Sequence, residues 1–312
     1  MYIKKNTALH GITFHHFFNN KFFLKGQGAI NQDHFRKLID HIGRENIIDA
    51  EEFYSLVKNN QYNERKVCFT FDDGLQCQYD IAKPILDEYK IKAFFFIFTS
   101  SITNKPGLLE LYRYFRLKYY KDINIFYQEF FEIYESIFKI SIKYIYKRNN
   151  NKIIEQKKIY KFMTKNDLLF RIVRDHYCSD LEYNKIMSLL FKKNNFSKEQ
   201  ILKKLYMKAS HIKNLHKSGH VIGGHSHSHF TNMEERSLDI QRDEYKNCRD
   251  ILSKTLDVPI YSMSHPCGSY NNNTINSLQK LNFKMGFDSY LNNKINTKKY
   301  YFCLPRQDHS NI

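Results

Sequence analysis

Short apolar runs alternate with segments of helical periodicity over much of this chain. Strands that alternate with helices in this way indicate a parallel sheet with crossover helices. The expected strands are Gly11–His15, Val67–Phe71, Ala93–Phe98, His220–Ile222, Ile260–Ser264, Lys284–Phe287 and Tyr301–Leu304. The expected helices are Gln32–Ile42, Tyr79–Tyr89, Lys208–Lys217, Leu238–Leu256 and Thr274–Leu281. Asn31 is expected to cap the first helix, because its side-chain oxygen can accept an amide of the opening turn.

The middle of the chain, residues 102–206, has a different pattern of long amphipathic stretches rich in Phe, Tyr and Lys. Apolar residues three and four positions apart form one stripe per helix, which is typical of helices that pack on each other. We therefore expect a helical insertion at 102–206 within a single domain of residues 1–312, with an exposed loop at Lys147–Asn151. A lipid- or cofactor-binding face, a lid and a dimer contact are alternatives for this insertion.

The chain is strongly basic, with a formal net charge of +17 in 312 residues. Such a charge suits an anionic partner, such as a nucleic acid, a phosphorylated sugar or a membrane surface. The excess consists mostly of Lys among many Asn, Ile and Tyr residues, so biased amino-acid usage explains it equally well. It is concentrated in residues 101–210, so the charge by itself identifies no partner.

The six cysteines are scattered, without a C-x-x-C pair. In a chain of this length, that pattern is typical of reduced thiols in a cytosolic protein. The basic start, Met1–Thr7, is not followed by an apolar segment of the length of an export signal. No run approaches the ~18 apolar residues that a membrane span needs. We expect a cytoplasmic protein without a transmembrane span.

Two polar clusters follow expected strands: Thr70–Gly74, which reads T-F-D-D-G, and His225–His229, which reads H-S-H-S-H. Each alone is common as a solvated turn or a surface histidine pair. Together, at the edge where loops assemble sites in α/β folds, they favour a functional site. One carboxylate and two imidazoles four residues apart can hold a divalent metal and leave coordination positions open, while the second carboxylate can act as a base. This chemistry is typical of a hydrolase.

T-F-D-D-G and H-S-x-x-H are both motifs of the polysaccharide deacetylases of the NodB-homology group, carbohydrate esterase family four, which this chain resembles over residues 8–100 and 207–312. The resemblance implies an α/β fold, a distorted (β/α) barrel of about seven strands. It also implies that Asp72 is the general base and that Asp73, His225 and His229 bind the metal. Zinc is the expected ion, with cobalt, nickel and manganese as alternatives.

The later motifs of the family are altered in this chain. The third, commonly R-x-P-Y, reads Ser264–Cys267 here and lacks both Arg and Tyr. By the resemblance, the backbone N–H of Cys267 would stabilise the oxyanion, a role that needs no particular side chain. The fourth motif, which ends in Trp, is absent because the chain has no Trp.

The fifth motif, L-x-I-x-x-H, is approximated by Leu304–His309, with Arg306 in place of Ile. His309 is the first candidate for the general acid, and Asp308 or Arg306 would orient it. His15 and His16 at the end of the first strand compete for this role, because one of the two can face the site. His16 is the member of the pair that we select.

The predicted activity is the metal-dependent removal of an N-acyl group, acetyl by the resemblance, from an amino sugar or a glycan precursor. A nucleotide-linked or lipid-linked sugar suits a cytosolic enzyme. A sugar-binding pseudoenzyme is the first alternative, because the third and fourth motifs are degenerate. A basic nucleic-acid-binding protein is the second; it would bind with steep salt dependence. No nucleic acid is expected, because the chain lacks a clustered aromatic and basic recognition motif. The oligomeric state stays open.

Overall fold

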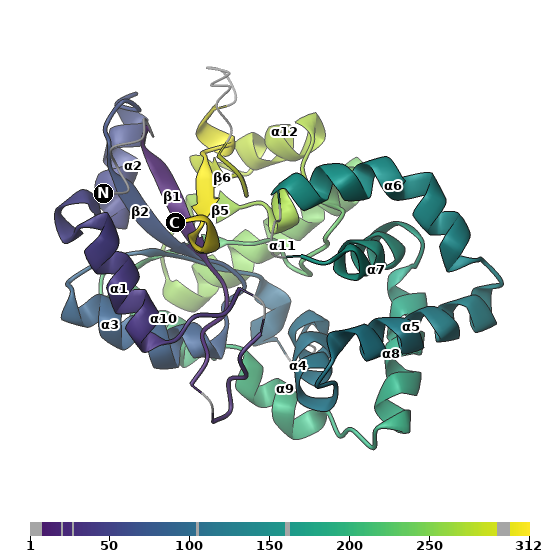
Figure 1. Ribbon diagram of the computed structural model, residues 1–312. Coiled ribbons are helices and arrows are strands. Elements are labelled where there is room, and N and C mark those ends of the chain that lie inside the picture. Colours follow the sequence, from purple (N-terminus) through teal and green to yellow (C-terminus); the bar gives the residue numbers. More distant parts are fainter. Residues whose placement is uncertain (1–7, 20, 27, 104–105, 160–162, 292–299) are drawn as a thin grey trace. The chain divides into compact units, whose positions relative to one another are not determined.

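The computed structural model describes residues 8–19, 21–26, 28–103, 106–159, 163–291 and 300–312. The expectation about residues 1–7 therefore lies outside the described residues. The chain divides into two compact units, one made of Met1–Gly107 with Lys203–Ile312 and the other of Leu108–Leu202 (Figure 1). The assignment of the whole chain to one domain with an insertion at 102–206 stays a prediction.

Seven parallel strands form the sheet of the first unit, within the described residues. They are β1 (His10–Phe14), β2 (Val67–Phe71), β3 (Phe94–Ile97), β4 (Val221–Gly224), β5 (Ser262–Ser264), β6 (Met285–Phe287) and β7 (Arg306–Asp308). Their order is β6-β5-β4-β3-β2-β1-β7. A parallel bridge joins Phe287, at the end of β6, to Leu304, just before β7. The sheet is thus a nearly closed barrel, which confirms the expected fold.

Helices connect the strands of the barrel, as crossover connections between parallel strands require. They are α1 (Gln32–Ile42), α2 (Ala50–Lys58), α3 (Lys83–Glu88), α10 (Ala209–Lys217), α11 (Leu238–Leu256) and α12 (Asn272–Lys280). The predicted bounds of α1 and α11 are confirmed. The side chain of Asn31 accepts the amide of His34 at 2.9 Å, so the predicted cap is also confirmed. The expected helix at 79–89 instead begins with a π-helical turn, η3 (Gln78–Ala82).

Side chains along the strands alternate between the barrel interior and the surrounding helices. Phe69 and Phe71 of β2 point outward and pack on Phe35 of α1, with ring centroids 5.8 and 6.2 Å apart. Phe96 points inward and contacts the ring of Phe287 across the barrel at 5.5 Å. Thr70 shares the inward face of β2 and lies near Arg306. Asp72, two positions after Thr70, therefore continues the inward face at the carboxyl end of β2.

The expected last strand, Tyr301–Leu304, is wrong. Residues 300–302 form a 3-10 turn, η7 (Tyr300–Phe302), and the strand that completes the sheet is β7, further along the chain. Phe302 and Leu304 are buried, at 5% and 1% exposure. The apolar run thus reflects burial, and strand-like pairing is confined to Leu304, which bridges Phe287. β7 reads R-Q-D and carries no apolar pattern. Periodicity of apolar residues therefore does not identify it as a strand.

The second unit is helical among its described residues. Its helices are α4 (Leu109–Tyr119), α5 (Ile123–Phe138), α6 (Ile142–Ile159), α7 (Lys165–His176) and α8 (Asp180–Lys193), while α9 (Glu199–Leu205) crosses the unit boundary. The expected loop at Lys147–Asn151 is wrong, because α6 continues through it. Ile145 and Ile153 are buried on the same face, and the Asn149 side chain donates between them to the Ile145 carbonyl at 2.9 Å. The polar run is part of one helix, in which Lys147, Arg148 and Asn151 are exposed and Asn149 lies on the buried face.

All six cysteines are free thiols. They are Cys68, Cys77, Cys178, Cys248, Cys267 and Cys303. Of these, Cys267 has an exposed side chain, whereas Cys178 and Cys303 are half-buried and the others are buried. Across the described part of the chain, every helix is either too short or too polar to cross a bilayer.

Gly223 in β4 allows close packing beneath the candidate site. A Cβ at this position would lie 2.5 Å from Phe96 ring atoms and 2.7 Å from the Ser262 hydroxyl. We expect Gly223→Ala to lower the free energy of unfolding by about 1–3 kcal/mol, because overpacking displaces a buried ring. Gly224→Ala is the matched control and should cost less, because its Cβ meets a single atom, Cys248 Sγ, as close as 3.1 Å. Urea unfolding checks both values, and equal stability of Gly223→Ala and the native protein would contradict the packing argument.

Candidate active site

The candidate residues follow strands whose carboxyl ends lie at one edge of the barrel. Asp72 and Asp73 follow β2, and His225 follows β4, which is separated from β2 by β3 alone. The backbone takes the left-handed conformation at Asp73 (φ 76°), Ser226 (φ 60°) and His229 (φ 58°). Each such non-glycine residue costs on the order of 1–3 kcal/mol and is typical of functional sites. These turns direct side chains from both loops toward one place.

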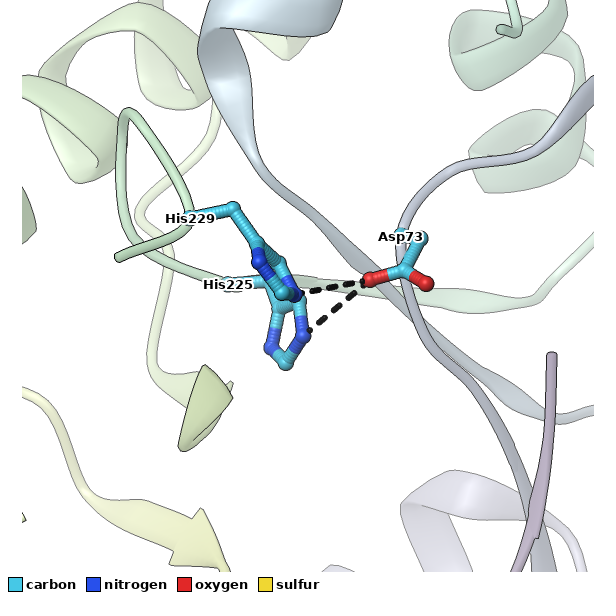
Figure 2. A group of neighbouring side chains, drawn as sticks. All are labelled: Asp73, His225 and His229. Atoms are coloured by element: carbon cyan, nitrogen blue, oxygen red, sulfur yellow. Dashed lines mark ion pairs between the residues drawn. The ribbon is translucent and has the colours of Figure 1, made fainter. Parts of the chain in front are cut away.

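Asp73, His225 and His229 converge in Figure 2. Asp73 Oδ1 lies 3.4 Å from His225 Nε2 and 3.1 Å from His229 Nε2. Asp73 Oδ1 is buried and has no partner with hydrogen-bond geometry among the residues that the structure describes. Tetrahedral coordination at ~2.0–2.2 Å places neighbouring ligand atoms about 3.3–3.6 Å apart, close to the distances found here. The three groups therefore fit a divalent ion with open positions.

The His225 ring is oriented by β5. Its Nδ1 lies 2.9 Å from the backbone carbonyl oxygen of Ser264 and 2.6 Å from the Ser264 hydroxyl. A neutral imidazole that donates Nδ1–H to this carbonyl keeps the Nε2 lone pair free, on the side that faces Asp73. Metal-binding histidines are oriented by such hydrogen bonds. The His225 ring is thus held with Nε2 toward Asp73, in the orientation that a metal ligand needs.

The charges of the three groups depend on each other. Burial alone would raise the pKa of Asp73, but His229 and His225 outweigh it and hold this pKa well below its usual range. Burial alone would lower the pKa of His229, whereas the Asp73 carboxylate outweighs burial and raises it. Without a metal, the Asp73 carboxylate thus favours a proton on His229. A divalent cation at the same place would replace that proton.

Asp72 is held beside this group in a second network. Its side chain is 3% exposed, and its Oδ1 accepts hydrogen bonds from Arg306 Nη1 at 2.8 Å and from the Ser264 hydroxyl at 3.1 Å. Its Oδ2 faces His15 Nε2 at 3.9 Å. Burial alone would raise the pKa of Asp72, but the charge and hydrogen bond of Arg306, together with His225 and His15, outweigh it and lower this pKa. Asp72 is therefore ionised at neutral pH and can accept a proton.

His309 lies at the same edge of the barrel, in the short turn η8 (His309–Asn311) after β7. Its Nδ1 lies 3.1 Å from the Thr13 carbonyl oxygen, and its ring stacks on Phe14 with centroids 5.1 Å apart. Burial lowers the pKa of His309, so this ring is neutral at pH 7. Of the two residues expected to orient His309, Asp308 approaches its ring, with Oδ1 3.7 Å from His309 Nδ1, whereas the charge of Arg306 is paired with Asp72.

His15 approaches Asp72: its Nε2 lies 3.9 Å from Asp72 Oδ2. The ring of His16, which we selected from the sequence, stacks beside His15 with centroids 6.2 Å apart. Both residues lie after β1, which ends at Phe14. His15 continues the inward face of β1, on which Gly11 and Thr13 lie.

Cys267 lies in the turn η6 (Pro266–Gly268) that follows β5. Its backbone is left-handed (φ 54°, ψ 14°) and its side chain is exposed. The turn comes directly after Ser264 and His265, so it borders the network that holds Asp72 and His225. An oxyanion contact from the Cys267 N–H stays a prediction.

Glu244 of α11 organises the histidine loop. It is 7% exposed, and its carboxylate accepts the backbone amides of His227 at 3.0 Å and Ser228 at 2.7 Å, together with the Ser228 hydroxyl at 2.8 Å. Inside the loop, the His229 amide donates to the Ser226 hydroxyl at 3.0 Å. A carboxylate that accepts three donors fixes the backbone between the two candidate ligands.

We expect Glu244→Ala to lower metal affinity by about 10–100-fold, because losing a group that holds metal ligands in place typically costs this much. Three donors would lose their acceptor, and each buried donor without one costs about 1–3 kcal/mol. Asp243→Ala, which removes an exposed carboxylate from the same helix, is the matched control. Competitive metal titration checks both variants. Equal affinities of Glu244→Ala and Asp243→Ala would show that the loop needs no support from Glu244.

Sequence reasoning missed Glu244, Ser264 and Gln78. The buried Gln78 side chain donates to the backbone carbonyls of His15 at 2.9 Å and Asp72 at 2.6 Å, and so joins the ends of β1 and β2. Glu244 had a detectable signal, because it lies on the same helical stripe as Cys248 and Leu252, which are both buried. A charged residue on a buried stripe requires a partner. Ser264 and Gln78 had no comparable signal.

The polysaccharide deacetylase family model matches residues 59–114 and 181–286, which is just over half of the chain. The matched segments contain the T-F-D-D-G sequence, the H-S-x-x-H sequence and the turn with Cys267. The chain matches no curated protein sequence.

Several solved structures share the fold. The deacetylase PplD from Streptococcus pyogenes, in complex with acetate, has a TM-score of 0.55 at 17% identity, over 98% of this chain and 96% of the other. IcaB from Ammonifex degensii has a TM-score of 0.55 at 13% identity, over 97% and 92%. The BpsB deacetylase domain from Bordetella bronchiseptica has a TM-score of 0.53 at 12% identity, over 96% and 95%. At these identities the likeness concerns the fold.

Proposed function

Because this chain belongs to the polysaccharide deacetylase family, we propose that it is a metal-dependent hydrolase that removes an N-acetyl group from an amino sugar or a glycan precursor. The observation that carries the proposal is the convergence of Asp73, His225 and His229 beside the ionised Asp72. Membership of the family alone supports only the removal of acetyl groups from glycans. The four side chains supply the means of hydrolysis.

The ion would be held by Asp73, His225 and His229, and one carboxylate with two imidazoles favours zinc over cobalt, nickel or manganese. When bound, it supplies Lewis acidity toward the acyl carbonyl and toward water. The Asp73 carboxylate would balance part of the charge of the ion. The Ser264 carbonyl holds the His225 ring by its Nδ1, which leaves Nε2 free to bind.

Asp72 acts as the general base in this proposal. Its carboxylate takes one proton from the attacking water as the water oxygen bonds to the acyl carbon. The lowered pKa of Asp72, caused mainly by Arg306, keeps the accepting form present at neutral pH. The backbone N–H of Cys267 is proposed to donate to the oxyanion of the tetrahedral intermediate.

The leaving amine must gain a proton as the C–N bond breaks, which yields a free amino sugar and a carboxylate. We propose His15, rather than His16, as the member of the pair that serves the site, because its Nε2 is next to Asp72 Oδ2. His309 remains a candidate for the general acid. It is neutral at rest because of burial, and its Nε2 has no hydrogen-bond partner among the described residues. His309 would therefore have to take up a proton before donating one.

We also propose a cytoplasmic location, which six free thiols support. A cytoplasmic substrate would be a precursor, such as a nucleotide-linked or lipid-linked N-acyl sugar, rather than a mature polymer. The formal net charge of +17 suits a diphosphate-linked donor.

Metal analysis of the purified protein, combined with amine release from a panel of sugars, tests the proposed function. The panel contains free, nucleotide-linked and lipid-linked sugars, each as its N-acetyl and N-formyl form. The proposal predicts about one ion per chain and release of one amine and one acetate per turnover, abolished by a chelator and restored by Zn²⁺. Metal retention without amine release from any sugar would instead indicate a sugar-binding pseudoenzyme.

A further inference from the structure

Arg306, the first residue of β7, is a buried cation inside the barrel at 1% exposure. Its guanidinium carbon lies 6.0 Å from the ring centroid of Phe96 and 5.9 Å from that of Phe287. A charge in such surroundings is stable only when it is paired and hydrogen-bonded. Its ion pair is with Asp72, at 2.8 Å. The charge of Arg306 is thus committed to the proposed general base.

The guanidinium is fixed at both ends. Its Nε donates to the Asp288 carbonyl oxygen at 2.5 Å, and its Nη1 donates to Asp72 Oδ1 at 2.8 Å and reaches the Thr70 hydroxyl at 3.4 Å. Because the group is planar and rigid, anchoring Nε sets the direction of Nη1. The donor to Asp72 is therefore in place before any substrate binds.

Gly11 makes room for the stem of this side chain. Gly11 and Arg306 are partners in the register of β1 with β7. A Cβ on Gly11 would lie 3.0 Å from Arg306 Cγ and 3.2 Å from Thr70 Cγ2. The glycine thus permits the arginine to extend across the interior face of β1 toward β2.

Two departures from the family pattern meet at the same carboxylate oxygen. Ser264 stands where the third motif commonly has Arg, and Arg306 stands where the fifth has Ile. Both donate to Asp72 Oδ1, whereas Oδ2 faces His15 at 3.9 Å. Because Oδ1 already accepts two hydrogen bonds, Oδ2 is the oxygen with lone pairs available to a proton.

We propose that Arg306 is a positioning residue that holds Asp72 Oδ1, so that Oδ2 is the atom that accepts the proton during hydrolysis. The inference rests on the proposed function, in which Asp72 is the general base. Among the described residues, the hydrogen bonds of Arg306 go to Asp288, Thr70 and Asp72 and to none of the three candidate metal ligands, and its side chain is only 1% exposed. Its loss should therefore affect the rate of the chemical step rather than binding of substrate or metal.

The test compares Arg306→Gln and Arg306→Lys with the native protein and with Arg36→Gln, a surface control whose partner is Glu88. Metal content, kcat and KM are measured for each protein, together with crystal structures of the native protein and of the variants. We expect Arg306→Gln to lower kcat by about 10²-fold, as misplacement of a catalytic group by about 1 Å does. KM and metal content should stay within about threefold of the native values. Arg306→Lys should recover part of the rate, because it keeps the charge, but not all of it, because one ammonium cannot contact both Asp288 and Asp72.

A native kcat in Arg306→Gln, or a loss that follows metal content or KM, would overturn the proposal. Should Arg306→Gln fail to fold, Arg306→Lys decides alone, and a native kcat in that variant would overturn it. If the native protein releases no amine from any sugar, the proposed function fails, but the crystal structures still decide the positioning role. The Asp72 carboxylate must then turn away from its native orientation in the variants, and an unchanged orientation would count against Arg306.

Discussion

Asp72→Asn should lower kcat by about 10²–10⁴-fold, the typical contribution of a general base, while the protein keeps its metal. The amide has no lone pair basic enough to accept a proton from water, yet its size and shape leave the neighbouring ligands in place. Asp72 is not among the three converging ligands, so metal content should stay at about one ion per chain. Steady-state kinetics and metal analysis on the same preparation check both statements.

Stability must be measured alongside, because Asp72→Asn leaves Arg306 without its ion-pair partner. Removing one partner of a buried pair costs about 3–5 kcal/mol of folding stability. The kinetics must therefore be measured at a temperature well below the midpoint of thermal unfolding. Asp80→Asn, the same change at an exposed position shortly after Asp72, is the matched control and should keep native kinetics. A variant at Asp72 that loses its metal but turns over normally when metal is supplied would reverse the roles of the two aspartates.

His225→Ala should lose both metal and turnover. Loss of a mere hydrogen-bonding partner of a metal ligand costs about 10–100-fold in affinity, so loss of a ligand should exceed that range. His225 is also 1% exposed and hydrogen-bonded to Ser264, so alanine leaves a polar gap that a small imidazole can enter. Metal titration, with and without added imidazole, measures the loss and its partial recovery.

His227→Ala is the matched control within the same loop. His227 lies between the two candidate ligands, but its Nδ1 is 2.8 Å from the Thr99 hydroxyl, and it does not belong to the converging group. This variant should still bind about one ion per chain. If His227→Ala lost metal as completely as His225→Ala, the assignment of ligands within the loop would be incorrect.

The candidate ligands could be predicted from the sequence because each belongs to a short segment that directly follows a strand. Asp73 comes two residues after β2, and His225 follows β4 without a gap. In a parallel sheet, all carboxyl ends share one edge, so alternation of strands and helices is enough to bring Asp73 and His225 together. Their convergence needs no knowledge of side-chain packing.

The support of Asp72 could not be predicted in this way. Arg306 is 234 positions away in sequence, and its contact depends on the pairing of β7 with β1 and on the absence of a side chain at Gly11. β7 has no apolar pattern to identify it, whereas the nearby apolar run ending at Leu304 suggests a strand that does not form. The register of a strand of three residues is set by tertiary contacts, which hydrophobic periodicity does not report.

The proposed preference for His15 over His16 rests on a contact with Asp72 that the sequence does not show. Both residues lie after the last residue of β1, where the alternation of strand side chains no longer fixes the direction of either ring. The predicted strand ended at His15, whereas β1 ends at Phe14. The phase of the strand is visible only from its partners, Gly11 with Cys68 and Thr13 with Thr70.

Anomalous diffraction from crystals of the purified, metal-loaded protein tests the central claim most directly. Data collected on both sides of the absorption edge identify the element and its position. The account predicts one ion bound by Asp73 Oδ1, His225 Nε2 and His229 Nε2, with Asp72 outside the coordination sphere and its Oδ1 still paired with Arg306. Anomalous density elsewhere in the chain, or none at these three side chains at saturating metal, would contradict it.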